Sequence, residues 1–210
     1  MEINQSKRQQ NKERKKKALI DAAEMLFIKN GFDNTSIDDV AKQADLTKRT
    51  LYQYFISKED LYLAVVLRAA KQLTATYEEA FAAGGTALEK IKRANQVYLK
   101  FYFEHGDQFL LLNYMPTNRQ NCEASPHYPE LAALDGVRIG HYLNLIEMGK
   151  RDGSINVALD VRKAVFFCFF AAHSMMYTVS SMGNEIWEMI GLEKNDFLQF
   201  SVELFSDALQ

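Results

Sequence analysis

The sequence predicts an all-α protein of about nine helices. Apolar side chains recur at helical spacing along almost the whole chain, and no segment alternates as a half-buried strand would. Only three prolines and ten glycines interrupt the 210 residues. With 48% hydrophobic and 25% charged residues, the composition is typical of a globular protein that buries one core and carries a small appended module.

The first predicted helix buries one face. Apolar residues at i, i+3, i+4, i+7 and i+8 form that face, and they are Leu19, Ala22, Ala23, Leu26 and Phe27. We expect Gly31 to end the helix, because glycine accepts the left-handed backbone that follows many helices.

Two short helices follow. The second has Ile37, Val40, Ala41 and Ala44 on one face, and Thr35 or Ser36 supplies its N-cap. After the turn 45–47, a third helix is expected from Lys48 to Phe55, with Thr47 as its cap and with Leu51 and Phe55 buried.

The remaining helices are longer. Ser57 is the expected cap of a helix that runs towards Ala83, where Gly84 and Gly85 break it, and a fifth helix carries the stripe from Leu88 to Tyr102. All three prolines fall between Asn113 and Glu130, which predicts a long loop. Further helical segments are expected at 109–112, 131–150, 161–182 and 197–209.

Three helices with a three-residue turn between the second and third describe a helix-turn-helix. Packing of helix two across helix three leaves donors and amphipathic rings outward, at Lys48, Arg49, Thr50, Tyr52, Gln53 and Tyr54. Such a face suits the major groove of DNA. Periodicity alone also fits an amphipathic helical hairpin that binds no nucleic acid.

The charge distribution favours a polyanionic partner for the N-terminal end. Residues 1–58 carry twelve Lys and Arg against eight Asp and Glu, a net charge of +4, whereas the rest of the chain has a net charge of −6. A basic end on an acidic body is typical of nucleic-acid binding. The other interpretation of the first twenty residues is a solvated, disordered tail.

The window from Thr35 to Tyr62 resembles the signature of the TetR family of regulators. The matching positions are Ala41, Ala44, Leu46, Thr47, Leu51, Tyr52, Tyr54, Phe55, Lys58, Glu59 and Leu61. The resemblance implies a bacterial, ligand-responsive transcriptional regulator, expected to act as a repressor, with residues 1–58 as the helix-turn-helix DNA-binding domain and 59–210 as the helical ligand-binding and dimerisation domain.

The resemblance also implies residue roles. Ser36, Thr47, Tyr54 and Lys58 would bind operator phosphates. Base edges would be read by Lys48, Arg49 and Gln53, with Tyr52 against a thymine methyl group or the backbone and Thr50 on the same face. Many family members have glycine where Asp45 stands, so we expect Asp45 to adopt a left-handed conformation with mild strain. Arg49 also replaces a common glycine, which leaves the operator sequence open.

The C-terminal part is expected to form a homodimer and to bind a largely apolar or aromatic small molecule. The segment 164–172 is apolar around its whole circumference, so one face would meet a partner subunit, together with the last helix, in a four-helix interface. A single monomeric core is the alternative. The candidate pocket residues are Tyr98, Tyr102, Phe109, Asn113, Met115, Phe166, Phe170, His173 and Tyr177. The same aromatic stripe also fits plain core.

The sequence gives no support to several other classes. The four histidines and two cysteines lack metal-ligand spacing, no catalytic motif or cofactor loop is present, and the longest apolar stretch is shorter than a membrane span. We expect a cytoplasmic protein with reduced thiols, no metal, no cofactor and no enzyme activity. The rival interpretation is a helical cytosolic enzyme or protein-binding adaptor, which would not retain duplex DNA at low salt.

Overall fold

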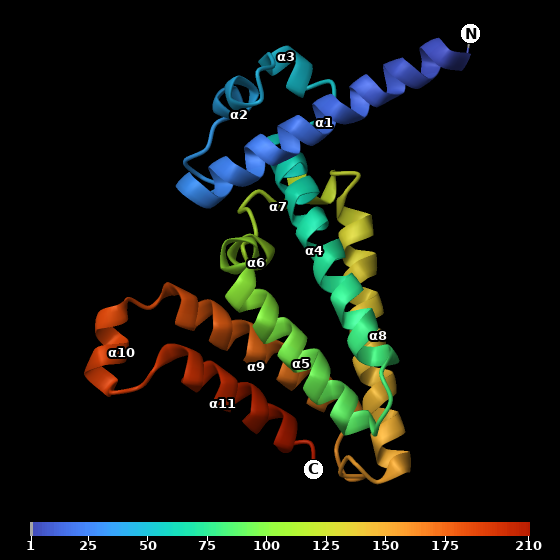
Figure 1. Ribbon diagram of the computed structural model, residues 1–210, viewed down its shortest axis with the longest axis vertical. Helices are drawn as coiled ribbons and strands as arrows, with labels where there is room; N and C mark the ends of the chain where they lie inside the picture. Colours follow the sequence, from blue (N-terminus) through green and yellow to red (C-terminus); the bar gives the residue numbers. More distant parts are fainter. Residues whose placement is uncertain (1) are drawn as a thin grey trace. The chain divides into compact units, whose positions relative to one another are not determined.

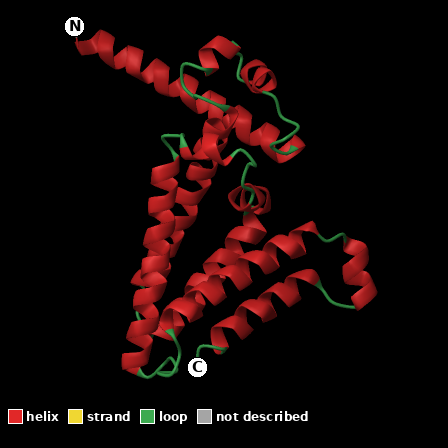
Figure 2. Cartoon of the chain, turned by 180° about the vertical axis from the view of Figure 1, so that it is seen from behind, coloured by secondary structure: helices red, strands yellow, loops and turns green. Residues whose placement is uncertain are grey.

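The computed structural model describes the backbone of residues 2–210 and the side chains of 7–164 and 166–210. Within this range every regular element is a helix, as Figure 2 shows. The helices are α1 (Glu2–Asn30), α2 (Ile37–Gln43), α3 (Lys48–Leu51), α4 (Lys58–Ala82), α5 (Ala87–Glu104), α6 (Gly106–Asn113), α7 (Arg119–Glu123), α8 (Tyr128–Asp152), α9 (Val161–Ser181), α10 (Asn184–Ile190) and α11 (Lys194–Asp207). The all-α prediction is confirmed.

The chain forms two compact units. The N-terminal unit consists of Met1–Ala70 and Tyr114–Ala132, and the C-terminal unit consists of Lys71–Asn113 and Ala133–Gln210. Helix α4 therefore contributes residues to both units. The assignment of 1–58 to DNA binding and of 59–210 to ligand binding stays a prediction, because packing alone does not say what each part binds.

The N-terminal unit is built around the apolar faces that the periodicity predicts. Leu19 and Ala23 of α1, Val40 of α2, and Leu51 and Phe55 in and after α3 are all fully buried. Four rings close this core, with centroid separations of 5.1–5.8 Å among Phe27, Phe32, Tyr62 and Tyr114. Burial of large apolar side chains contributes about 1.5–3 kcal/mol each, so this core fixes how α1, α2 and α4 cross.

The predicted caps of α2 and α3 are confirmed. The Ser36 hydroxyl accepts a hydrogen bond from the Asp39 N–H at 3.1 Å, and the Thr47 hydroxyl accepts one from the Thr50 N–H at 3.1 Å. Thr35, the other candidate cap, is buried instead, and its hydroxyl donates to the carbonyl oxygens of Leu26 and Gly31. Each cap satisfies an amide that the first helical turn leaves unpaired.

Several element boundaries differ from the prediction. Helix α3 ends at Leu51 rather than Phe55, because Gln53 N–H bonds to the Thr50 carbonyl and the chain tightens into turns. The expected loop 113–130 contains α7 and the start of α8, where Pro129 stands in the first helical turn and needs no N–H partner. Helix α10 was not predicted.

The C-terminal unit buries a core from α4, α5, α6, α8, α9 and α11, with Leu99, Phe109 and Ile146 among its fully buried side chains. The start of α5 is held by a capping box between Thr86 and Glu89. The N–H of Ala87, the first residue of α5, donates a hydrogen bond to the carboxylate of Asp152 at the end of α8, at 2.9 Å. These bonds connect segments far apart in the sequence.

Helix α9 is unusually apolar and unusually exposed. Of the helices in the described part of the chain, α9 is the one whose length and composition suffice to cross a membrane. Length and composition are weak evidence for a membrane span, because a helix whose apolar side is covered by protein passes the same test. Phe167 and Phe170 of α9 are about 60% exposed in the single chain.

Candidate nucleic-acid interface

The turn between α2 and α3 is set by backbone hydrogen bonds at the end of α2. Leu46 N–H bonds to the Ala41 carbonyl at 2.9 Å and Asp45 N–H bonds to the Lys42 carbonyl at 3.1 Å, which is the Schellman pattern of helix ends. This pattern requires a left-handed residue, and Asp45 has φ +54°. The left-handed conformation predicted for Asp45 is confirmed.

The outward face of α3 and of the turn that follows it is exposed to solvent within the single chain, as the sequence predicts. Lys48, Arg49 and Gln53 are exposed, and Tyr52 keeps 49% of its surface accessible. Thr50 and Tyr54 are half-buried at the edge of this face. The surface therefore presents two cations, an amide and a phenol, which match the acceptors and methyl groups of base edges in the major groove.

Lys48 is tied to α2. Its ammonium group lies 2.8 Å from the Asp38 carboxylate, and the hydrogen bond with Asp38 raises the pKa of Lys48. Both side chains are more than half exposed, so the pair gives little stability and is easily exchanged for a phosphate or a base.

The predicted phosphate contacts differ in their surroundings. Ser36 is exposed, but its hydroxyl donates to the Asp39 carboxylate at 2.5 Å. Lys58 at the start of α4 is half-buried; its ammonium group lies 3.3 Å from the Asp33 carbonyl and 4.2 Å from the centre of the Phe32 ring. Burial lowers the pKa of Lys58. These contacts hold Lys58 at the start of α4, beside the link between α1 and α2.

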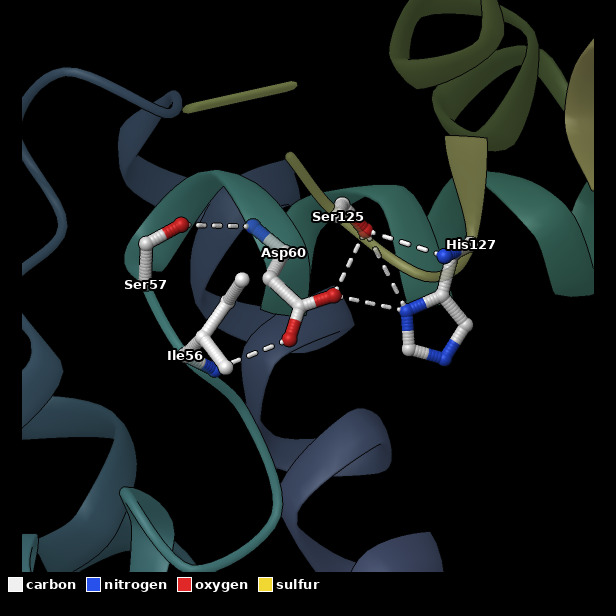
Figure 3. A network of polar contacts seen from close by, with 5 residues as sticks. All are labelled: Ile56, Ser57, Asp60, Ser125 and His127. Carbon is white, nitrogen blue, oxygen red and sulfur yellow. Dashed lines mark hydrogen bonds and ion pairs between the residues drawn. The ribbon is translucent and has the colours of Figure 1, made fainter. Parts of the chain in front are cut away.

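A buried carboxylate fixes the start of α4 (Figure 3). Asp60 is 1% exposed, and it accepts hydrogen bonds from the Ser125 hydroxyl at 2.6 Å and from the Ile56 N–H at 2.9 Å. His127 Nδ1 lies 2.7 Å from the same carboxylate. Burial opposes ionisation of Asp60, but these hydrogen bonds outweigh it and hold its pKa below the ordinary value.

Further bonds join the segment 114–132 to the helix-turn-helix. Asn121 donates to the Glu59 carboxylate at 3.2 Å, the Tyr62 hydroxyl donates to the Tyr114 carbonyl at 3.2 Å, and the Tyr114 hydroxyl donates to Asp33 at 3.0 Å. Sequence reasoning missed this segment because its prolines suggested only a loop.

The nine predicted pocket residues do not form one group. Tyr98 and Tyr102 pack against Phe109 with ring centroids 5.5 and 5.1 Å apart, and Asn113 hydrogen-bonds to Tyr98. Met115 belongs to the N-terminal unit and is 49% exposed.

The α9 members of the predicted set are also divided. Phe166, Phe170 and Tyr177 are 40–59% exposed in the single chain, so much of their apolar surface faces outward. That they line one ligand cavity with Tyr98 stays a prediction. His173 differs from them: burial lowers its pKa, with a smaller contribution from the charge of Arg138.

The interior of the C-terminal unit has a polar aromatic cluster that sequence reasoning did not identify. The Tyr142 hydroxyl donates to the Asn95 side chain at 2.9 Å, and Tyr77 hydrogen-bonds to Tyr142. Burial raises the pKa of Tyr98 to about 12. Arg138 pairs with Asp135, and its Nε is buried without a hydrogen-bond partner in the described part of the chain.

The helix-turn-helix region matches a family model. Residues 19–65 match the model described as "Bacterial regulatory proteins, tetR family". This range covers α1 from Leu19, the whole α2–turn–α3 element and the start of α4. Over these residues the chain is similar to regulators of the TetR family. The rival interpretation as an enzyme or adaptor finds no support in these similarities.

Two curated relatives extend the match beyond the helix-turn-helix region. The "Fatty acid metabolism regulator protein" of Bacillus subtilis is 26% identical over 186 residues, which cover 82% of this chain and 91% of the relative. The "HTH-type transcriptional activator FasR" of Mycolicibacterium smegmatis is 32% identical over 96 residues, which cover 46% of this chain and 43% of the relative.

Among solved structures, FadR from Bacillus subtilis in complex with stearoyl-CoA superposes with a TM-score of 0.69. It is 20% identical to this chain, and the match covers 92% of this chain and 98% of FadR. At this identity the likeness concerns the fold.

Proposed function

We propose that this chain is a one-component repressor of the TetR family that binds operator DNA as a homodimer and is released by a small molecule. The observation that carries the proposal is the exposed face of α3, which offers Lys48, Arg49 and Gln53 on a rigid, capped helix-turn-helix. As a DNA-binding switch it would need no catalytic group, and we place it in the cytoplasm, where the operator lies.

The exposed face of α3 supports the separate base-reading and phosphate-binding roles that the resemblance implies. Arg49 and Lys48 suit guanine O6 and N7, and Gln53 suits adenine N6 and N7. Tyr52 extends far enough to meet a thymine methyl group or the backbone. The phosphate contacts would come from the capping hydroxyls and from the start of α4, namely Ser36, Thr47, Tyr54 and Lys58.

The apolar surface of α9 and α11 supports the homodimer. Phe167 and Phe170 of α9 and Phe200 and Leu204 of α11 are 54–60% exposed, and α9 packs on α11. A monomer rarely leaves several large apolar side chains together in water. Pairing of α9 and α11 with the same helices of a second copy would bury them and account for an apolar helix without a membrane.

The polar aromatic cluster of the C-terminal unit supports an effector that is apolar or aromatic over most of its length. Tyr77, Tyr98 and Tyr142 offer ring faces and hydroxyl groups, and the Arg138 guanidinium offers a cation for an acidic group. The solved FadR holds stearoyl-CoA. We therefore propose an effector with an acyl or aromatic body and an anionic end.

Two stretches of chain provide a route from effector to operator. Helix α4 continues from the N-terminal unit into the C-terminal unit, and the segment 114–132 leaves the C-terminal unit at both ends and packs against the start of α4. An effector that prefers one position of these stretches would change the spacing of the two α3 helices. A coupling of about 1–3 kcal/mol would suffice.

The proposal is tested in two steps. Selection of bound fragments from a genomic or random duplex library with the full chain should return an inverted repeat whose half-sites lie one helical turn apart. A titration of that duplex complex with stearoyl-CoA, free stearate and coenzyme A should then release the DNA with the acyl compounds and not with coenzyme A alone.

Each step has a control and a contrary result. Gln53→Ala should bind the same duplex with a relaxed preference, and Arg138→Gln should bind it normally but resist release. Failure of the full chain to retain any duplex at low salt would overturn the proposal. Retention of DNA with all three compounds would overturn the proposed effector class alone.

A further inference from the structure

The first part of α1, residues 7–17, is a helix without a core of its own. It contains seven cations and one acid, namely Lys7, Arg8, Lys12, Arg14, Lys15, Lys16, Lys17 and Glu13. Residues 7–14 are all exposed, and from residue 7 onward the first buried side chain of the helix is that of Leu19. Figure 1 shows this part of α1 running on beyond α3 within the N-terminal unit. Lys, Arg, Gln and Glu favour helix, but the side chains of residues 7–14 are exposed, so packing does not explain why the helix extends so far.

One face of this extension forms a groove with the end of the helix-turn-helix. The groove holds about 800 Å³ and is lined by Arg8, Gln9, Asn11, Lys12 and Lys15 on one side and by Gln53 and Tyr54 on the other. Arg8, Lys12 and Lys15 stand at i, i+4 and i+7, so they point to the same side of α1. Gln53 and Tyr54 belong to the surface proposed above to meet DNA.

The cations of the groove are available for a ligand. None of Arg8, Lys12 and Lys15 pairs with a carboxylate of the described residues. Two cations on other sides of the helix have partners: Lys17 pairs with Asp21 at 2.7 Å, and Arg14 donates to the Asn11 side chain.

Lys16 fixes the position of the extension. Its ammonium group lies 5.9 Å from the centre of the buried Phe55 ring, in the direction of the helix-turn-helix. This contact holds the root of the extension beside the chain that follows α3.

We propose that this groove binds the phosphate backbone of duplex DNA beside the base pairs that α3 reads. The inference rests on the proposed function, since it needs α3 in the major groove. Three unpaired cations on one face match the evenly spaced negative charges of a DNA strand. Eleven helical residues from 7 to 17 span about 16 Å, which corresponds to about five base pairs along the duplex axis. The extension thus lengthens the DNA site read by each protomer beyond the reach of α3.

The salt dependence of DNA binding tests the proposed contact between the groove and the phosphate backbone. The test variant is Lys12→Ala/Lys15→Ala, and the control is Lys7→Ala/Arg14→Ala, which removes the same charge from another side of the same helix. Alanine keeps the helix in both variants. Dissociation constants are measured from 50 to 300 mM salt with a random-sequence 40-base-pair duplex and with the selected operator.

The test variant should bind both duplexes roughly 10- to 100-fold more weakly at 0.1 M salt, with the slope of log affinity against log salt reduced by about two for each bound protomer. The control should shift the slope by less than one. Trimming the operator ends by about five base pairs should weaken the wild-type chain and leave the test variant unchanged, because the variant no longer uses those phosphates.

The outcomes separate this inference from the function on which it rests. If the wild-type chain binds no duplex, both fail together. If it binds the operator and Gln53→Ala relaxes the sequence preference, but the test and control variants have equal slopes, the groove proposal alone is overturned. A third outcome is that both variants bind DNA equally, but the test variant alone loses binding to phosphatidylglycerol vesicles or to a polyglutamate peptide. That outcome would overturn the proposal and assign the groove to a membrane or to an acidic protein.

Discussion

Replacement of Asp60 by asparagine should loosen the start of α4. In the wild-type chain the buried carboxylate accepts hydrogen bonds from Ser125, His127 and the Ile56 N–H at 2.6–2.9 Å. An amide of the same shape has one acceptor oxygen, so at least one buried donor loses its partner and the others lose the contribution of the charge. Hydrogen bonds to a charged group contribute about 1.5–3 kcal/mol, and an unsatisfied buried donor costs about 1–3 kcal/mol. We expect Asp60→Asn to lower the free energy of unfolding by about 2–4 kcal/mol.

The effect should depend on pH with a defined sign. Because the pKa of Asp60 lies below its ordinary value in the folded chain, the ionised carboxylate stabilises the fold above the unfolded pKa, and this contribution is lost as pH falls through the folded pKa. The difference between the wild-type chain and Asp60→Asn should therefore be constant above about pH 5 and should shrink below about pH 4.

Urea unfolding followed by far-ultraviolet circular dichroism measures the change, and hydrogen exchange of the α4 amides locates it. Asp33→Asn is the matched control, because that exposed carboxylate accepts a single hydrogen bond, from Tyr114. Its effect should stay within about 0.5 kcal/mol. Equal destabilisation by the two variants, or a difference that grows on acidification, would refute the reasoning.

Substitutions at four other positions test separate parts of the molecule. Because φ is +54° at Asp45, Asp45→Gly should raise the free energy of unfolding by up to about 1 kcal/mol and Asp45→Val should lower it by about 1–2 kcal/mol. Equal thermal stability of the valine and glycine variants would contradict this prediction. Gln53→Ala should relax the sequence preference at one base-pair position at a cost of about 1–3 kcal/mol, and a selection that returns an unchanged consensus would contradict the role of Gln53. Lys58→Ala should weaken binding to all DNA sequences alike and reduce the slope of log affinity against log salt by about one, and an unchanged slope would contradict the role of Lys58. Phe170→Glu should shift the dimer to monomer in analytical ultracentrifugation, while Val157→Glu, which charges another exposed apolar site outside α9 and α11, should not; a dimeric Phe170 variant would place the interface elsewhere.

The helix-turn-helix could be predicted from the sequence because its determinants are local. A serine or threonine cap acts on an amide three residues away, and the apolar spacing that buries Leu51 and Phe55 is visible in one short window. The left-handed Asp45 followed from the place where glycine is common in the family, and the structure confirms it.

The remaining errors concern interactions that join distant parts of the chain. Pro129 was interpreted as part of a loop, although the first turn of a helix tolerates proline. The partner of Asp60 lies 65 residues away at Ser125, which no periodicity reveals. Likewise, the pattern of α9 shows that the helix is apolar but not that Phe166 and Phe170 face outward in the single chain, and no pattern points to Arg138, whose Nε is buried.

The return of residues 114–132 to the N-terminal unit has a consequence for how the unit is made and exchanged. A nascent chain that has left the ribosome only as far as Ala70 lacks the Ser125 and His127 side chains that bond to Asp60 and the Tyr114 ring that packs against Tyr62. The N-terminal unit therefore reaches its final stability only after synthesis has passed Ala132. For the same reason, a chimera that grafts residues 1–70 onto another regulator must carry 114–132 with them.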